Sequence, residues 1–220
     1  MRPPVAIIHL LILVFTLSLL MMFVYMGALS LAFEKLGLSQ DAAFVLLFGS
    51  LLGSGLNIPL FTVDVDHPVQ VPPQPSPWGP LQPPPFTGKT IIAVNVGGGI
   101  IPVVFSVYLL THQPVPAVDA LIATAITTTV SYLFSRPIPG LGVGMPILVA
   151  PVTAALVAVV IDPQHSAPLA YICGTLGVLL GADLLHLPEI RKLGAPVASI
   201  GGAGTFDGIF LTGIVAVLLA

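Results

Sequence analysis

The stretch GGAGTFDGIFLTGIVAVLLA, residues 201–220, is an apolar run that carries one acidic side chain, Asp207. A carboxylate in hydrocarbon is costly unless it is paired, solvated or protonated. A run of this length and apolarity predicts a helix that crosses a lipid bilayer. The sequence therefore raises the question of what Asp207 faces.

The composition of the whole chain is that of a membrane protein. Hydrophobic residues make up 56% and charged residues 7% of the 220 residues, and the mean hydropathy is +1.07. Soluble domains are about 25% charged, so six basic and nine acidic side chains cannot cover a water-facing globule. The lipid bilayer is the expected partner. A net charge of −3 without a basic cluster argues against nucleic acid.

Charged residues and Pro/Gly clusters divide the chain into seven expected spans, with six or eight as alternatives. Each can supply about 17–25 spanning residues. The first apolar run is too long for a signal peptide and no small-residue cleavage site follows it, so we expect a retained helix. Pro146 and Pro151 predict a kink in the fifth run. The expected spans are residues 5–33, 42–62, 90–111, 117–135, 142–161, 166–187 and 200–220.

The expected fold class is therefore all-α: one polytopic transmembrane helical bundle over residues 1–220, with helices broken by Gly and Pro. Its orientation follows from Lys and Arg, which favour the cytoplasmic side. With the N-terminus inside and the C-terminus outside, only Lys35 lies in an outer connection. The inner connections then hold Arg2, Lys89, Arg136, Arg191 and Lys192.

Residues 63–89, VDVDHPVQVPPQPSPWGPLQPPPFTGK, form a proline-rich connection that cannot be helical. We expect a cytoplasmic, partly polyproline-like loop. It is either a plain linker or a strand on which substrate docks, because FTVDVDHPVQV alternates apolar and polar residues. Asp64, Asp66 and His67 have a spacing that could hold a metal, but a solvated face is the better interpretation. No metal site and no cofactor are predicted.

Polar and helix-breaking residues from five segments converge on the inner leaflet in this topology. They are Asn57, Asn95, Asp183, Asp207 and the stretch SRPIPGLGVGMP at 135–146. Broken helices around buried ionisable groups usually mark a site. Asn57 and Asn95 could instead cap helices or join them. His186, three residues after Asp183, is expected to orient it or to lie at the interface.

Glycine has two interpretations in this chain. The pairs Gly49/Gly53, Gly177/Gly181 and Gly204/Gly208 are spaced to let helices pack closely. Gly202, Gly204 and Gly208 could also let a substrate backbone approach Asp207. The single Cys173 excludes a disulfide framework and is expected to be a small packing residue.

The motifs GLNIPL, NVGGGIIP, RPIPGLGVGMP, GADLL and GGAGTFDGIF resemble a family of uncharacterised prokaryotic integral membrane proteins. This resemblance implies the inner (cytoplasmic) cell membrane of a bacterium or archaeon.

A more distant resemblance, confined to the last two spans, is to presenilin and signal-peptide-peptidase-type (GxGD) intramembrane aspartyl proteases. It implies that Asp183 and Asp207 are the catalytic pair. The sequence departs from that pattern in three ways. GTFD replaces G-x-G-D, no Tyr precedes Asp183, and the Pro-Ala-Leu segment is absent. Pro137 and Pro139 of RPIPG are candidates to replace that segment.

Three functions remain open from the sequence. In a protease, Asp183 and Asp207 would share a proton and cleave a transmembrane peptide substrate. In a proton- or cation-coupled carrier or channel, the same residues would form an ion site, with the cation as partner. In a non-catalytic scaffold, the Asp residues would be protonated or paired and would hold helices together.

Overall fold

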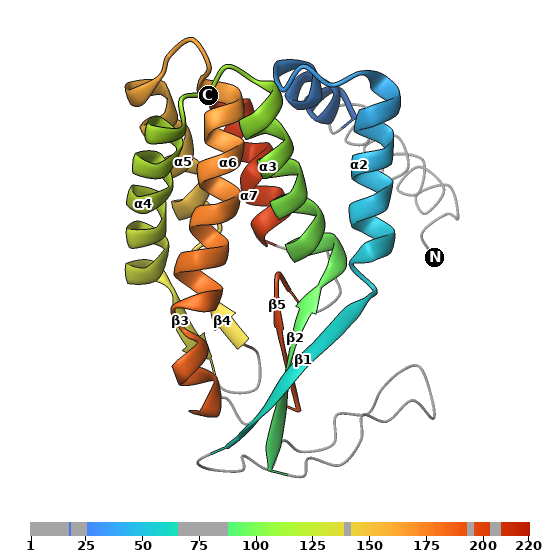
Figure 1. The fold of residues 1–220 in the computed structure, drawn as a ribbon, viewed down its shortest axis with the longest axis vertical. Helices are drawn as coiled ribbons and strands as arrows, with labels where there is room; N and C mark the ends of the chain where they lie inside the picture. Colours follow the sequence, from blue (N-terminus) through green and yellow to red (C-terminus); the bar gives the residue numbers. More distant parts are fainter. Residues whose placement is uncertain (1–17, 19–25, 66–87, 139–141, 193–195, 203–207) are drawn as a thin grey trace, which may run out of the picture.

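The computed structural model describes residues 18, 26–65, 88–138, 142–192, 196–202 and 208–220. The described chain is mostly helical, and α6 runs through the centre of the bundle, packed against α3, α4, α5 and α7 (Figure 1). A short helix, Met26–Lys35, precedes the labelled ones. The α-helices are α2 (Gln40–Gly53), α3 (Ile101–His112), α4 (Ala117–Phe134), α5 (Val149–Ile161), α6 (Ser166–Val178) and α7 (Gly208–Leu219).

Three short helices of other types extend the bundle. The π-helix η1 (Val96–Ile100) leads into α3, and the π-helix η2 (Leu179–Leu184) continues α6. The 3₁₀ helix η3 (Leu187–Lys192) follows η2. Both π-helices therefore lie at the same end of the bundle, where α3 begins and α6 ends.

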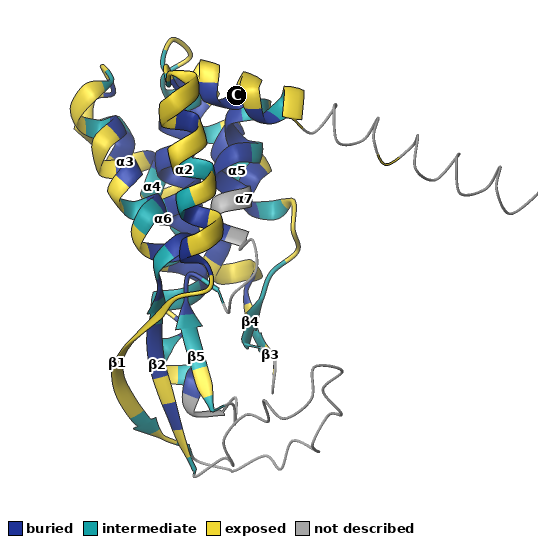
Figure 2. Ribbon diagram, turned by 90° about the vertical axis from the view of Figure 1, so that its right-hand side faces the viewer, coloured by how far each residue is buried: buried dark blue, intermediate teal, exposed yellow. Residues whose placement is uncertain are grey.

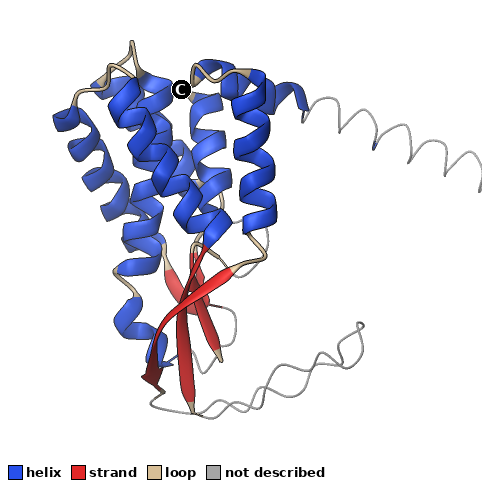
Figure 3. Cartoon of the chain, turned by 45° about the vertical axis from the view of Figure 1, so that its right-hand side comes forward, coloured by secondary structure: helices blue, strands red, loops and turns tan. Residues whose placement is uncertain are grey.

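Two small sheets lie at that end (Figure 3), so the all-α expectation is wrong in this part. In the larger sheet, β2 (Lys89–Asn95) is central, with β1 (Asn57–Asp64) antiparallel on one side and β5 (Val197–Ile200) parallel on the other. In the smaller sheet, β3 (Arg136–Ile138) pairs with β4 (Gly142–Gly144). The expected alternating strand after Phe61 is confirmed only as far as Asp64, within β1.

The expected spans match helices that are shorter than predicted. Residues 57–62, 90–95 and 142–144 at the ends of three expected spans are strand instead, and the seventh span overlaps β5 only at Ile200. These ends are rich in Val, Ile, Thr and Gly, which favour strand or tight turns over helix. The first span, 5–33, lies mostly outside the described residues. The kink expected in α5 is absent, because the helix begins after Pro146 and Pro151 lies in its first turn, where a missing N–H is tolerated.

Among the described residues, two helical segments, α4 and Ser166–Leu184, are long and apolar enough to cross a membrane. Helix Met26–Lys35 and α2 together would count as a third, but they are bent by 115° to one another. The outer surface of the bundle carries large exposed apolar side chains, such as Leu52 at 75% and Val160 at 80% exposure (Figure 2). Such a surface is typical of a bundle in contact with lipid, and the long apolar helices indicate membrane association.

Helix Met26–Lys35 lies at the end of the bundle opposite the sheets, next to the start of α2 and the last turn of α7 (Figures 2 and 3). Its buried residues Leu29, Ala32 and Phe33 follow a helical spacing and pack, with Leu36 in the turn after it, into the main apolar core. Lys35 Nζ donates to the backbone oxygens of Val217 and Leu218 in the last turn of α7, at 3.3 and 3.4 Å. A cation is favourable there because helix C-termini carry partial negative charge.

Candidate functional site

Asp183 lies in η2, at the level of the sheets. Its Oδ2 accepts a hydrogen bond from the backbone N–H of Gly201, just after β5, at 2.8 Å. Gly201 has a φ of +82°, and an added Cβ would lie 2.7 Å from Gly99 Cα in η1. Only glycine fits this position. The Asp183 carboxylate in η2 therefore binds a residue that directly follows β5 and lies against η1. π-helical turns are rare and often occur at functional sites.

Asp207 and Gly204 lie outside the described residues, but both flanks of their segment are described. Gly201 and Gly202 precede it, and Gly201 bonds to Asp183. After it, α7 begins at Gly208, and Ile209 is buried in one apolar cluster with Ala182, the residue before Asp183. The structure therefore brings the surroundings of Asp183 together with both ends of the segment that holds Asp207.

Asn95 joins the end of α2, β1 and the start of η1 through its side-chain hydrogen bonds. It is 1% exposed, and its Nδ2 donates to Ser54 O at 2.7 Å and to Asn57 Oδ1 at 3.1 Å. Its Oδ1 accepts from Gly98 N at 2.8 Å, which caps the start of η1. Ser199 Oγ donates to the same Asn57 oxygen at 2.6 Å. These bonds support the interpretation of Asn57 and Asn95 as capping and joining residues.

His186 is buried, and its contacts are with packing elements. Its Nδ1 lies 3.0 Å from the carbonyl oxygen of Gly181, which can only accept, so Nδ1 carries the proton. Its ring centre is 4.8 Å from that of Tyr132 on α4. These contacts give His186 a place between α4 and η2, and a role in orienting Asp183 stays a prediction.

The RPIPG segment also reaches this end of the molecule. Pro137 in β3 is the register partner of Val143 in β4, and Pro139 lies outside the described residues. Val143 packs against the cluster that contains Ala182 and Ile209. The hairpin thus lies beside the residues that flank both aspartates in the sequence.

The predicted close packing is confirmed for Gly177 and Gly181 and for Gly53, whereas a Cβ on Gly49 would meet only Ile101 Cδ1, at 3.8 Å. A Cβ on Gly177 would lie 2.6 Å from Thr127 Cγ2, and one on Gly181 would lie 2.8 Å from Ser131 Cβ, so α4 approaches α6 and η2 closely. A Cβ on Gly53 would lie 3.1 Å from the backbone nitrogen of Gly97, where α2 crosses η1. The Gly204/Gly208 pair is not fully within the described residues.

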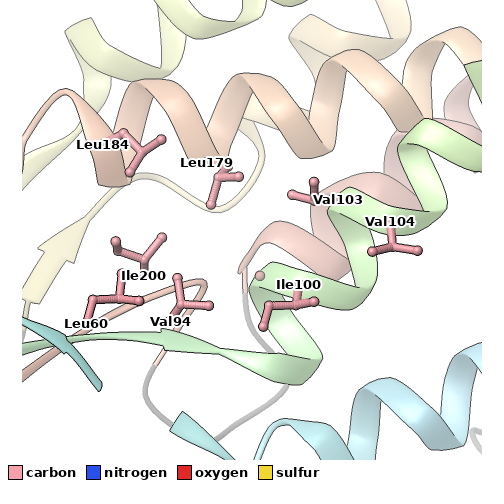
Figure 4. A pocket seen from close by; sticks show the side chains of 9 residues that line it. Leu60, Val94, Ile100, Val103, Val104, Leu179, Leu184 and Ile200 are labelled. Carbon is pink, nitrogen blue, oxygen red and sulfur yellow. The ribbon is translucent and has the colours of Figure 1, made fainter. Parts of the chain in front are cut away.

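An apolar pocket of about 310 Å³, which the sequence did not predict, lies between the larger sheet and the two π-helices (Figure 4). Leu184 and Ile200 line it, and they are the chain neighbours of Asp183 and Gly201. The pocket therefore adjoins the bond between those two residues. Its lining is assembled from ordinary Leu, Val and Ile residues of separate elements, so no motif in the sequence marks it.

The described residues contain no group of three or more His, Cys, Asp or Glu placed to hold a metal ion. Asp64 of the expected D-x-D-H group is 86% exposed and lies 3.9 Å from Lys89, as a surface pair. Asp66 and His67 lie outside the described residues.

Comparisons with known proteins give a family and no function. No curated protein and no solved structure matches the chain, and nothing in these comparisons links it to presenilin-type proteases. One family model, described as "Protein of unknown function (DUF1614)", matches residues 51–219. This range contains both aspartates, both sheets and the pocket. The chain belongs to the DUF1614 family.

Proposed function

We propose that this protein is an intramembrane aspartyl protease in which Asp183 and Asp207 form the catalytic pair. The observation that carries the proposal is the 2.8 Å hydrogen bond between Asp183 Oδ2 and Gly201 N. It holds the Asp183 carboxylate against the chain that leads to Asp207. The packing of Ile209 beside Ala182 supports the same pairing from the other flank.

The chemistry follows from two neighbouring carboxyl groups, which share one proton because both cannot be ionised at close range. The ionised carboxylate takes a proton from water as the water oxygen attacks the carbonyl carbon of the scissile peptide bond. The protonated carboxyl gives its proton to the carbonyl oxygen. The C–N bond then breaks as the proton held by the first carboxyl moves to the leaving nitrogen. One hydroxyl of the tetrahedral intermediate returns its proton to the second carboxylate as the new C=O bond forms, which restores the starting pair.

The arrangement of the elements supports a peptide substrate that enters from the sheet end. β1 is an outer strand of the larger sheet, and no described strand pairs with its other edge. An edge strand offers backbone N–H and C=O groups to an extended peptide. The Lys and Arg distribution supports a cytoplasmic position for this end, in the inner membrane of a bacterium or archaeon as the sequence resemblance implies.

The packing of the opposite end favours a protease over a carrier. A carrier needs a polar route to both faces of the membrane. Beyond the level of the sheets, α6 is filled with buried apolar residues such as Leu169, Ile172 and Cys173. Helix Met26–Lys35 packs on the same end through Leu29, Ala32 and Phe33. A half packed mainly with apolar side chains suits a site that opens on one side only.

The test is peptide cleavage by purified protein in lipid nanodiscs. Synthetic transmembrane peptides are incubated with wild type, Asp183→Asn and Asp207→Asn, and the products are identified by mass spectrometry. Asp41→Asn is the matched control, because this carboxylate is exposed in the first turn of α2, at the end opposite the sheets. We expect cleavage by wild type and by Asp41→Asn, and none by the other two, all four proteins showing cooperative melting.

Other outcomes would decide between the remaining functions. Cleavage by either Asp183→Asn or Asp207→Asn would rule out the pair. Proton or cation flux in proteoliposomes that is lost in both variants, without peptide cleavage, would assign the carrier. Normal melting with no activity of either kind in wild type would favour the scaffold.

A further inference from the structure

The apolar pocket and the edge of β1 meet at Leu60. The register of β1 against β2 shifts between Pro59 and Phe61, so Leu60 lies at an irregularity in the strand. Leu60 lines the pocket and is 53% exposed. A β-bulge redirects a side chain and bends the strand. The outer edge of β1 therefore adjoins the mouth of the pocket.

The pocket itself is suited to apolar side chains of moderate size. Figure 4 shows Val94, Val103, Leu179 and Ile200 lying around one space. Its lining is entirely apolar and its volume is about 310 Å³, near the lower limit of about 300–1,000 Å³ for ligand pockets. A polar ligand would leave its hydrogen-bonding groups unpaired there. A leucine or phenylalanine side chain would displace water or lipid at no such cost.

The backbone edge of β1 decides between a peptide and a lipid as occupant. Asp64 at the far end of β1 reaches the cytoplasm, but Ile58 and Leu60, in the half of the strand next to the helices, are exposed and meet the apolar edge of the membrane. Unpaired backbone N–H and C=O groups in such surroundings are costly. A lipid acyl chain would fill the pocket and leave those groups unpaired. An extended peptide would pair with the edge and fill the pocket with a side chain.

We infer that the pocket is a specificity site for a large apolar side chain of a peptide that binds in extended form along β1. This inference rests on the proposed protease function, for which it names the substrate class. Because Leu184 and Ile200 flank Asp183 and Gly201 in the chain, a side chain held in the pocket keeps the adjoining peptide bonds close to Asp183.

The test uses the full-length Asp183→Asn protein in nanodiscs, so that binding is measured without cleavage. The probe is a capped peptide of alternating valine and threonine with one photo-leucine, and labelled residues are mapped by mass spectrometry. We expect labelling on the pocket residues Val103, Leu184 or Ile200. Val103→Trp, which fills the pocket, should lower the labelling about tenfold or more, the order of effect that one or two methylene groups produce in an apolar pocket.

Val107→Trp is the matched control, one helical turn further along α3, where the side chain is exposed and does not line the pocket. It should leave labelling unchanged. If Val103→Trp does not fold, Leu184→Ala gives the complementary test. It enlarges the pocket and should shift preference from photo-leucine to a diazirine derivative of phenylalanine.

Two results would overturn the inference. One is labelling that is absent, or that is no stronger at the pocket than at Val107. The other is a photoactivatable fatty acid that labels Val103 and that the peptide does not displace. The outcome is separable from that of the cleavage assay. Pocket labelling without wild-type cleavage would support the peptide-binding site and contradict the protease function. Cleavage without pocket labelling would support the protease function and contradict the peptide-binding site.

Discussion

Gly181 shows how a single residue sets the distance between two helices. An added Cβ would lie 2.8 Å from Ser131 Cβ and 2.9 Å from Tyr132 N, and closer still to the backbone oxygen of Thr128. Backbone atoms of α4 cannot move aside as a flexible side chain can. We therefore predict that Gly181→Ala destabilises the protein by about 1–3 kcal/mol, the usual cost of overpacking.

Thermal unfolding in detergent micelles measures this effect, with Gly27→Ala as control. Gly27 is also helical, and an added Cβ there meets nothing within 4 Å. The control should melt at or slightly above the wild-type temperature, because alanine favours helix. Equal melting temperatures for Gly181→Ala and wild type would show that α4 and η2 are not packed as described.

Asp162 and His165 form a hydrogen-bonded pair in the connection between α5 and α6. Asp162 Oδ2 lies 2.8 Å from His165 Nδ1, and Oδ1 accepts from the backbone N–H groups of Gln164 and His165. The side-chain bond to His165 lowers the pKa of Asp162 below its ordinary value of 3.8. The ionised form is thus favoured in the folded protein.

A lowered pKa stabilises the folded state above the unfolded pKa, and this contribution is lost as the pH falls through the folded value. Asp162→Asn keeps an oxygen for the two backbone bonds and removes the charge. We predict that it lowers the melting temperature at neutral pH, and that the difference from wild type disappears below the folded pKa of Asp162. A difference that stays constant from pH 7 down to pH 3 would show that the charge is irrelevant.

At the scale of elements, Asn95 holds the end of α2, the start of η1 and the sheet together. Its amide bonds to Ser54 O and Asn57 Oδ1, and its oxygen accepts from Gly98 N. Removal of the amide leaves buried backbone groups unpaired, which costs about 1–3 kcal/mol. We predict a loss of this size in the free energy of unfolding of Asn95→Ala, measured by denaturant titration in micelles.

Ser199→Ala is the control for this joint. It removes one bond, to Asn57, and leaves those of Asn95 in place. We expect a markedly smaller loss than for Asn95→Ala. Equal losses in the two variants would mean that Asn95 does not hold the joint.

The sequence predicted the convergence of polar residues better than it predicted their secondary structure. Asp183 and Asn95 were noticeable because a polar side chain in an apolar run needs a partner, and the structure gives each one a backbone partner. Apart from the part of β1 from Phe61 to Asp64, the strands were missed; TIIAV in β2, for example, is as apolar as a helix, and periodicity cannot separate the two. The π-helices depend on tertiary contacts such as Gly201 against Gly99, which no local pattern encodes.

At the scale of the molecule, the two long apolar helical segments differ in how far they are buried. In α6 and η2, 72% of the most apolar window is buried, against 22% in α4. Composition alone cannot make this distinction, because both windows have the same hydropathy of 1.5. The central position of Ser166–Leu184 places Asp183 at the end of the most protected helix, beside the sheets.

The orientation of the whole molecule gives the last prediction. Lys89 and Arg136 lie in β2 and β3, at the sheet end, whereas Lys35 and Gln164 lie at the other end. Positive charge favours the cytoplasmic side, so the sheets should face the cytoplasm. Cys173 is buried, and its replacement by alanine provides a background for single new cysteines.

In that background, a membrane-impermeant maleimide added to intact cells should label Gln164→Cys and not Lys89→Cys. In inverted membrane vesicles, the labelling should be reversed. The opposite pattern would place the sheets, Asp183 and the apolar pocket on the outer face. A protease would then cleave peptides that approach from outside the cell and not from the cytoplasm. Labelling of both positions from one side would contradict a membrane-spanning bundle, because the two ends would then share one compartment.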